Sequence, residues 1–195
     1  MKKLVQLTVF LLLSSGMLLA CGGGTAQTPG YTGDFLSWTG SDDVNHFFTL
    51  VRVNGKTGDV TTIGGADFFT AMAYAPDGKL YGISDELHII DPATGSTVML
   101  GTFQYGASTL LMHGAAFSPL GTLYVADNSF PSRVFTVNLS NAALTYVGTP
   151  TALIWDLEFA SNGTLYGAFA DLFTLRASDM TTVYTVGSTV LTCTP

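Results

Sequence analysis

The chain contains 195 residues, of which 47% are hydrophobic and only 11% are charged. This composition excludes a disordered protein and predicts a single globular domain with a hydrophobic core. The formal charge of −7 argues against nucleic acid as a partner, because a surface that binds phosphates needs an excess of basic side chains.

The first twenty residues predict an export signal that is not part of the fold. Lys2 and Lys3 form a basic start, an apolar run follows from Leu4 to Leu13, and small residues come next. The stretch LLAC, which ends at Cys21, resembles the lipobox of bacterial lipoproteins. A plain signal peptide or a membrane anchor is the alternative, but the segment is short for a spanning helix of about 20 apolar residues.

The lipobox resemblance implies a lipid on the Cys21 sulfur, removal of residues 1–20 and attachment to a membrane of the bacterial cell envelope. Gly22 is not the Asp that often marks retention in the inner membrane, which favours the outer membrane and leaves its periplasmic or surface side open. Residues 21–32 are rich in Gly and small polar residues and predict a flexible tether. With a lipid on Cys21, Cys193 is left as a lone cysteine, so a disulfide framework is excluded.

Residues 33–195 repeat one sequence pattern. The motif G-x-L-Y begins at Gly78, Gly121 and Gly163, and Gly33 begins a degenerate fourth copy, GDFL. In the second copy, four strand-like runs rich in β-branched or aromatic residues follow one another: AMAYAP, KLYGIS, LHIIDP and STVMLGTF. Asp, Pro and Gly separate the runs and favour tight turns. The long connection leads to the next copy, so each copy predicts a four-stranded antiparallel sheet.

A period of about 40 to 45 residues with four strands is typical of a β-propeller blade. Over about residues 33–195 the chain resembles secreted bacterial β-propeller repeat proteins of the broad NHL-like and WD-repeat-like kind. The resemblance implies an all-β domain, which we expect to contain four blades. The last residues align with the first run of a blade, so Val190 to Thr194 are expected to share a blade with Asp34 to Trp38 and to close the ring. The alternative is a fragment of a larger propeller.

One tyrosine of the repeat is expected to lie in the core in three of the four copies. Tyr81, Tyr124 and Tyr166 occupy the same position of the G-x-L-Y motif. Because equivalent positions of a repeat have equivalent neighbours, the three side chains are expected to be comparably buried.

Asp156 and Glu158 stand out when the copies are aligned. They occupy alternate positions of the first run, where the other copies carry small or apolar residues such as Ala71 and Ala73. Two carboxylates on one face of a strand offer the hard oxygen ligands that Ca²⁺ prefers. The interpretation that we favour is that both reach solvent or pair with Arg133 or Arg176. No cofactor is therefore expected, and a bound Ca²⁺ ion is the alternative.

His88 replaces an apolar residue at a core-type position of the third run, which predicts a hydrogen-bonded core histidine, with a ligand role as the alternative. Further acids follow the second run of each copy and are expected to gather on one rim, where they would attract Ca²⁺ or a basic partner unless they serve only as turn residues. These are Asp42 and Asp43, Asp85 and Glu86, Asp127, and Asp171.

The sequence contains no nucleophile elbow, P-loop or dinucleotide fingerprint. We therefore interpret the chain as a non-catalytic, lipid-anchored binding scaffold whose partner is a protein or a glycan. One alternative is a calcium-dependent propeller hydrolase or lactonase with Asp156 and Glu158 as metal ligands. Another is a structural subunit that assembles through incomplete propeller edges.

Overall fold

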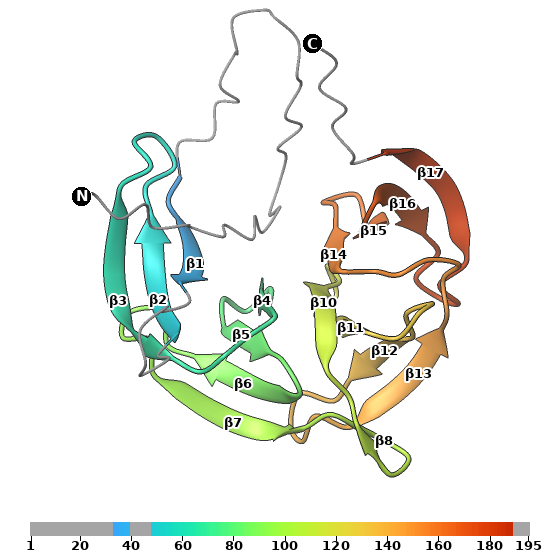
Figure 1. Ribbon diagram of the computed structural model, residues 1–195, viewed down its shortest axis with the longest axis horizontal. Helices are drawn as coiled ribbons and strands as arrows, with labels where there is room; N and C mark the ends of the chain where they lie inside the picture. Colours follow the sequence, from blue (N-terminus) through green and yellow to red (C-terminus); the bar gives the residue numbers. More distant parts are fainter. Residues whose placement is uncertain (1–32, 40–47, 189–195) are drawn as a thin grey trace, which may run out of the picture. The chain divides into compact units, whose positions relative to one another are not determined.

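The computed structural model describes residues 33–39 and 48–188 (Figure 1). All regular secondary structure in this part of the chain is β-strand. A helix with the length and hydropathy of a membrane-spanning segment is absent from these residues. Asp42, Asp43, Cys21, Cys193 and the predicted closing strand from Val190 lie outside the described residues, so the predictions made for them stay predictions.

Four antiparallel sheets follow one another along the chain, each with its strands in sequence order. The first contains β1 (Phe35–Thr39), β2 (Phe48–Val53) and β3 (Val60–Ala66). The second contains β4 (Ala71–Tyr74), β5 (Leu80–Ile83), β6 (Glu86–Ile90) and β7 (Thr97–Thr102). The third contains β10 (Met112–Phe117), β11 (Leu123–Asp127), β12 (Val134–Val137) and β13 (Leu144–Gly148). The fourth contains β14 (Asp156–Phe159), β15 (Leu165–Ala168), β16 (Asp171–Leu175) and β17 (Thr182–Ser188).

These sheets confirm the predicted fold class, an all-β chain built of four propeller-type blades. The connection between the second and third sheets differs from the expectation of a plain crossover. It contains a short hairpin of β8 (Gln104–Tyr105) and β9 (Ser108–Thr109). Two-residue strands are too short for a periodic pattern, and only the left-handed Gly106 marks their turn in the sequence.

The described residues form two compact units. One contains residues 33–39, 48–68 and 90–97, and the other contains residues 69–89 and 98–188. The second unit therefore holds most of the second sheet and all of the third and fourth. Within it, β10 lies beside both β4 and β14 (Figure 1), so the first strands of successive sheets are neighbours.

The predicted hairpin turns are present. Gly78, Gly121 and Gly163 have φ between 82° and 86°, a left-handed conformation that only glycine adopts without strain. The turn between the third and fourth strands also needs a left-handed residue, and in the last two sheets Ala142 and Met180 occupy that place, both with φ of 58°. Both side chains are completely buried, so their burial offsets a strain of about 1 kcal/mol.

Two hydrophobic clusters hold the second unit together, one between each pair of successive sheets. Ala71, Ile83 and Leu87 of the second sheet pack with Val125 and Phe135 of the third. Alternate residues of the third sheet point to the other face and pack with the fourth, as strand geometry requires. This second cluster includes Ala116, Val134, Leu157, Phe173 and Met180.

The expectation of equal tyrosine burial is wrong. Tyr81 is 4% exposed, whereas Tyr124 and Tyr166 are half-buried. Tyr81 and Tyr124 each pack on a ring at the end of the next sheet's first strand, namely Phe117 at 5.3 Å and Phe159 at 5.4 Å. Two copies therefore repeat the ring contact although the exposure of their tyrosines differs.

Candidate functional site

In the second unit, most of the candidate functional side chains lie at the same end of the sheets. In the third and fourth sheets the first strand begins at this end and the second strand finishes there, since Met112 is paired with Asp127 and Asp156 with Ala168. The long crossovers enter the sheets here, and we call it the crossover end. The G-x-L-Y turns lie at the opposite end.

Asp156 and Glu158 lie on one face of β14, and Leu157 between them points to the other face, into the core against the third sheet. The equivalent face of β10 packs on the fourth sheet. The close approach is visible at Gly114, where an added Cβ would lie only 3.2 Å from the Asp156 carbonyl carbon. In β14 this face therefore carries two carboxylates where the other sheets carry small residues that pack against a neighbour.

The two carboxylates have unusual acidities. Burial raises the pKa of Asp156 to about 6, although the backbone N–H of Leu157, 2.9 Å from Oδ1, lowers it. Burial, and then repulsion from Asp156, raise the pKa of Glu158 to about 7. The two arginines that were expected as possible partners of these acids bind other carboxylates, since Arg133 pairs with Asp127 and Arg176 with Asp179. Pairing of the two acids with these arginines is therefore wrong.

His88 lies in the sheet core, as the alignment of the copies predicts. It is 6% exposed, and its equivalents Val51, Phe135 and Phe173 are all buried. Its Nε2 lies 2.9 Å from Oε2 of Glu86, and its ring packs edge-on against Phe69 at 5.3 Å. The histidine is thus a buried side chain with a carboxylate partner on its own strand.

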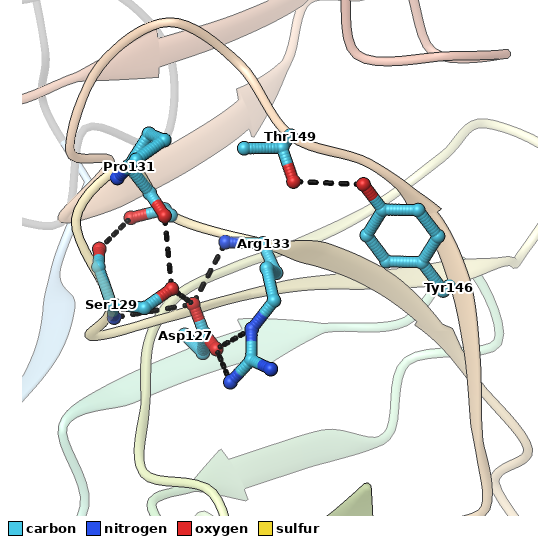
Figure 2. A network of polar contacts seen from close by, with 7 residues as sticks. Asp127, Ser129, Pro131, Arg133, Tyr146 and Thr149 are labelled. Carbon is cyan, nitrogen blue, oxygen red and sulfur yellow. Dashed lines mark hydrogen bonds and ion pairs between the residues drawn. The ribbon is translucent and has the colours of Figure 1, made fainter.

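Asp127 is the centre of a polar network at the crossover end (Figure 2). Its side chain is 1% exposed, and its Oδ2 accepts from Nε and Nη2 of Arg133 at 2.7 and 2.6 Å. Its Oδ1 accepts from the backbone N–H groups of Arg133 and Ser129 at 2.8 and 3.2 Å, and the Ser129 hydroxyl lies 2.5 Å away. The carboxylate orders the loop between β11 and β12, so its lone pairs are used inside the protein.

Arg133 also packs over aromatic rings. Its guanidinium carbon lies 5.4 Å from the ring centre of Tyr105, on the crossover hairpin, and 5.9 Å from that of Phe135. The cation therefore joins the hairpin to the third sheet.

The remaining predicted acids of this unit lie at the same end, as expected for residues after the second strand. Asp85 is exposed in the turn between β5 and β6, and Asp171 begins β16. Within residues 33–39 and 48–188, His, Cys, Asp and Glu side chains nowhere form a group of three that could hold a metal ion.

Sequence reasoning missed an aromatic cluster at the crossover end. The Trp155 ring lies 5.4 Å from the His113 ring and 5.1 Å from the Phe169 ring. Trp155 is 42% exposed and Phe169 is 46% exposed, and partial burial lowers the pKa of His113. We call these three residues the aromatic patch. The available signal was the position of Trp155, directly before the unusual acids of β14.

The aromatic patch is assembled by the sheet register. Trp155 precedes β14, and its backbone N–H donates to the Ala168 carbonyl at 2.9 Å, which places Trp155 beside Phe169 at the end of β15. His113 sits at a register shift between Met112 and Gly114, and such irregularities re-aim a side chain.

Comparison with known proteins supports the fold. Two similar solved structures are proteins of unknown function from Bacteroides thetaiotaomicron (TM-score 0.53, 13% identity, 73% of this chain) and Bacteroides caccae (TM-score 0.51, 14% identity, 80% of this chain). A third is named as a candidate gluconolactonase (TM-score 0.51, 17% identity, 78% of this chain). The chain spans 39%, 58% and 61% of the lengths of these three proteins.

No curated protein matches the sequence. A family model does match, over residues 35–193, and it describes a repeat of unknown function, DUF6923. This range includes all four sheets, and the chain therefore belongs to the DUF6923 repeat family.

Proposed function

We propose that the protein is an exported lipoprotein whose domain is a non-catalytic binding module, and that the crossover end of the last two sheets receives a protein or glycan partner. The aromatic patch is the observation that carries this proposal. Large rings are enriched where proteins bind partners, and Trp155 and Phe169 are both more than two-fifths exposed.

The surroundings of the patch support a binding role. Phe130, in the loop between β11 and β12, is 81% exposed at the same end. The Ser132 hydroxyl accepts from the Ile154 N–H at 2.9 Å, which fixes this loop to the crossover that carries Trp155. The exposed rings are thus presented on an ordered support, which lowers the entropic cost of binding.

The chain's two tryptophans, Trp38 and Trp155, allow a direct test. The full-length protein, labelled with 5-fluorotryptophan and held in mild detergent, is titrated with a panel of peptides and a panel of soluble glycans. We expect a ligand from these panels to shift the fluorine resonance of Trp155 and to leave that of Trp38 in place. Trp38→Phe assigns the two signals. Panels that shift neither signal would contradict the proposal.

The membrane attachment is tested separately. Labelled fatty acid is expected to enter the wild-type chain and not Cys21→Ser, which should also accumulate as unprocessed precursor. Equal labelling of both would remove the lipid anchor from the proposal.

A second candidate function is a calcium-dependent hydrolase or lactonase. It is favoured by the two carboxylates that share one face of β14, and one structural neighbour is named as a candidate gluconolactonase. This function predicts bound Ca²⁺ and turnover of small lactones or esters, both lost in Asp156→Asn and Glu158→Gln. Turnover that survives in both variants would exclude these residues as its metal ligands.

A further inference from the structure

The crossover end of the second unit carries an excess of negative charge. Four acids lie at this end on β-strand ends or in turns: Asp85, Glu86, Asp156 and Asp171. Asp156 directly follows Trp155, and the Asp171 carbonyl accepts from the Phe169 N–H at 3.1 Å. Carboxylates therefore belong to the same strand ends as the rings of the aromatic patch.

The cations of this unit do not balance these acids. Lys79 and Arg176 lie in turns at the opposite end, where each pairs with an aspartate of its own turn. Among the described residues of the unit, Arg133 is the remaining lysine or arginine, and it is bound to the buried Asp127. Glu86 has His88 as its partner at 2.9 Å, which leaves Asp85, Asp156 and Asp171 without a lysine or arginine partner in the described part of this unit. A partner that brings positive charge to the crossover end would meet acids without displacing a cation of this unit.

We propose that the aromatic patch binds a cationic segment of a protein partner, with a lysine or arginine side chain against the rings of Trp155 and Phe169. This inference rests on the proposed function and names the chemistry of its partner. The face of an aromatic ring attracts a cation, and the indole ring does so most strongly. Acids at the ends of the same strands add attraction for the same charge.

The patch itself adds no opposing charge. Partial burial lowers the pKa of His113, so its ring is neutral at pH 7 and above. An anionic partner would meet the acids at this end as like charges. A neutral glycan would use the rings, and its hydroxyl groups would donate hydrogen bonds to the carboxylates, but it would not use their negative charge. A cationic segment uses both features, which is why it fits this surface best.

The test measures binding of short fluorescein-labelled peptides to the full-length protein in mild detergent. One peptide alternates Gly with Lys, and two others of the same length alternate Gly with Glu and Gly with Gln. We expect the lysine peptide to bind and the other two to bind at least about tenfold more weakly. Trp155→Leu keeps an apolar side chain but removes the ring, and it is expected to weaken lysine-peptide binding at least about fivefold.

Two further variants control for general attraction and for folding. Leu120→Ala removes an apolar side chain that is 96% exposed at the opposite end and is expected to leave affinity unchanged. Trp155→Phe keeps a ring that attracts a cation less strongly than indole, and its affinity is expected to lie between those of the wild type and Trp155→Leu. That order would show that the loss in Trp155→Leu comes from the ring. Full affinity in Trp155→Leu would show that net charge alone attracts the lysine peptide, and it would overturn the inference.

The outcome also separates this inference from the proposed function. If a neutral glycan or the glutamate peptide shifts the Trp155 resonance and the lysine peptide does not, the binding function stands and the cationic partner is wrong. If no ligand shifts that resonance, both are wrong.

Discussion

Adjacent glycines of β3 offer a matched test of how closely a strand approaches a neighbouring turn within the first unit. A Cβ added to Gly64 would lie far below 3.0 Å from the Thr94 carbonyl oxygen and 3.1 Å from its carbonyl carbon. A Cβ added to Gly65 would meet nothing within 4 Å. Gly64→Ala and Gly65→Ala therefore add the same methyl to the same strand, with and without a clash.

The clash at Gly64 cannot be relieved by a side-chain rotation, because the obstacle is backbone. The turn that carries Thr94 is held by several hydrogen bonds to Asp91, including Gly95 N–H to the Asp91 carbonyl at 2.8 Å and the Thr94 hydroxyl to Oδ2 at 2.8 Å. The strand or the turn must move as a whole. Overpacking of this kind costs about 3 kcal/mol, the upper end of the usual range.

Both substitutions also reduce the freedom of the unfolded chain, which stabilises by about 0.4 to 1 kcal/mol in each. Gly65→Ala is thus expected to be neutral or slightly stabilising, and Gly64→Ala to lower the free energy of unfolding by about 2 kcal/mol. The difference of about 3 kcal/mol corresponds to about 6 to 12 °C in Tm for a domain of this size. Thermal and urea melts measure it, and equal stability of the two variants would refute the close approach.

Two other perturbations follow from the buried charges. Because burial raises the pKa of Asp156 to about 6 and that of Glu158 to about 7, the folded state keeps protons that the unfolded state releases above about pH 4. Wild-type stability should fall as pH rises from about 4 to 7. The raised pKa values correspond to about 3 kcal/mol for each group, and solvent screening of these partly exposed carboxylates reduces this effect. Asp156→Asn and Glu158→Gln are therefore each expected to stabilise by about 1 to 2 kcal/mol at pH 8 and by little at pH 4. Urea melts at the two pH values check this, and an equal gain at both would contradict the raised pKa values. Arg133→Met leaves the Asp127 carboxylate buried and is expected to cost about 3 kcal/mol. Adding Asp127→Asn should restore part of that loss in the same melts, and a purely additive double variant would show that the pair does not couple.

The blade pattern could be predicted because each copy carries its own turn chemistry. Glycine at 78, 121 and 163 marks the first hairpin in three copies, and the structure gives all three the left-handed conformation. The second turn is less regular in sequence, since Ala142 and Met180 take the left-handed place. Only the packed structure explains them, because both side chains fill the clusters between sheets.

The candidate site was predictable only in part, since departures from a repeat can be read from the sequence but contacts between copies cannot. Asp156 and Glu158 stood out because the other copies carry small residues at those positions. Trp155 and Phe169 come from the ends of two neighbouring strands, and His113 comes from a different sheet at a register shift. Such a shift changes where a side chain points without changing the hydrophobic pattern. A repeat protein can therefore acquire a binding surface at the ends of its strands while the pattern that specifies its core stays the same.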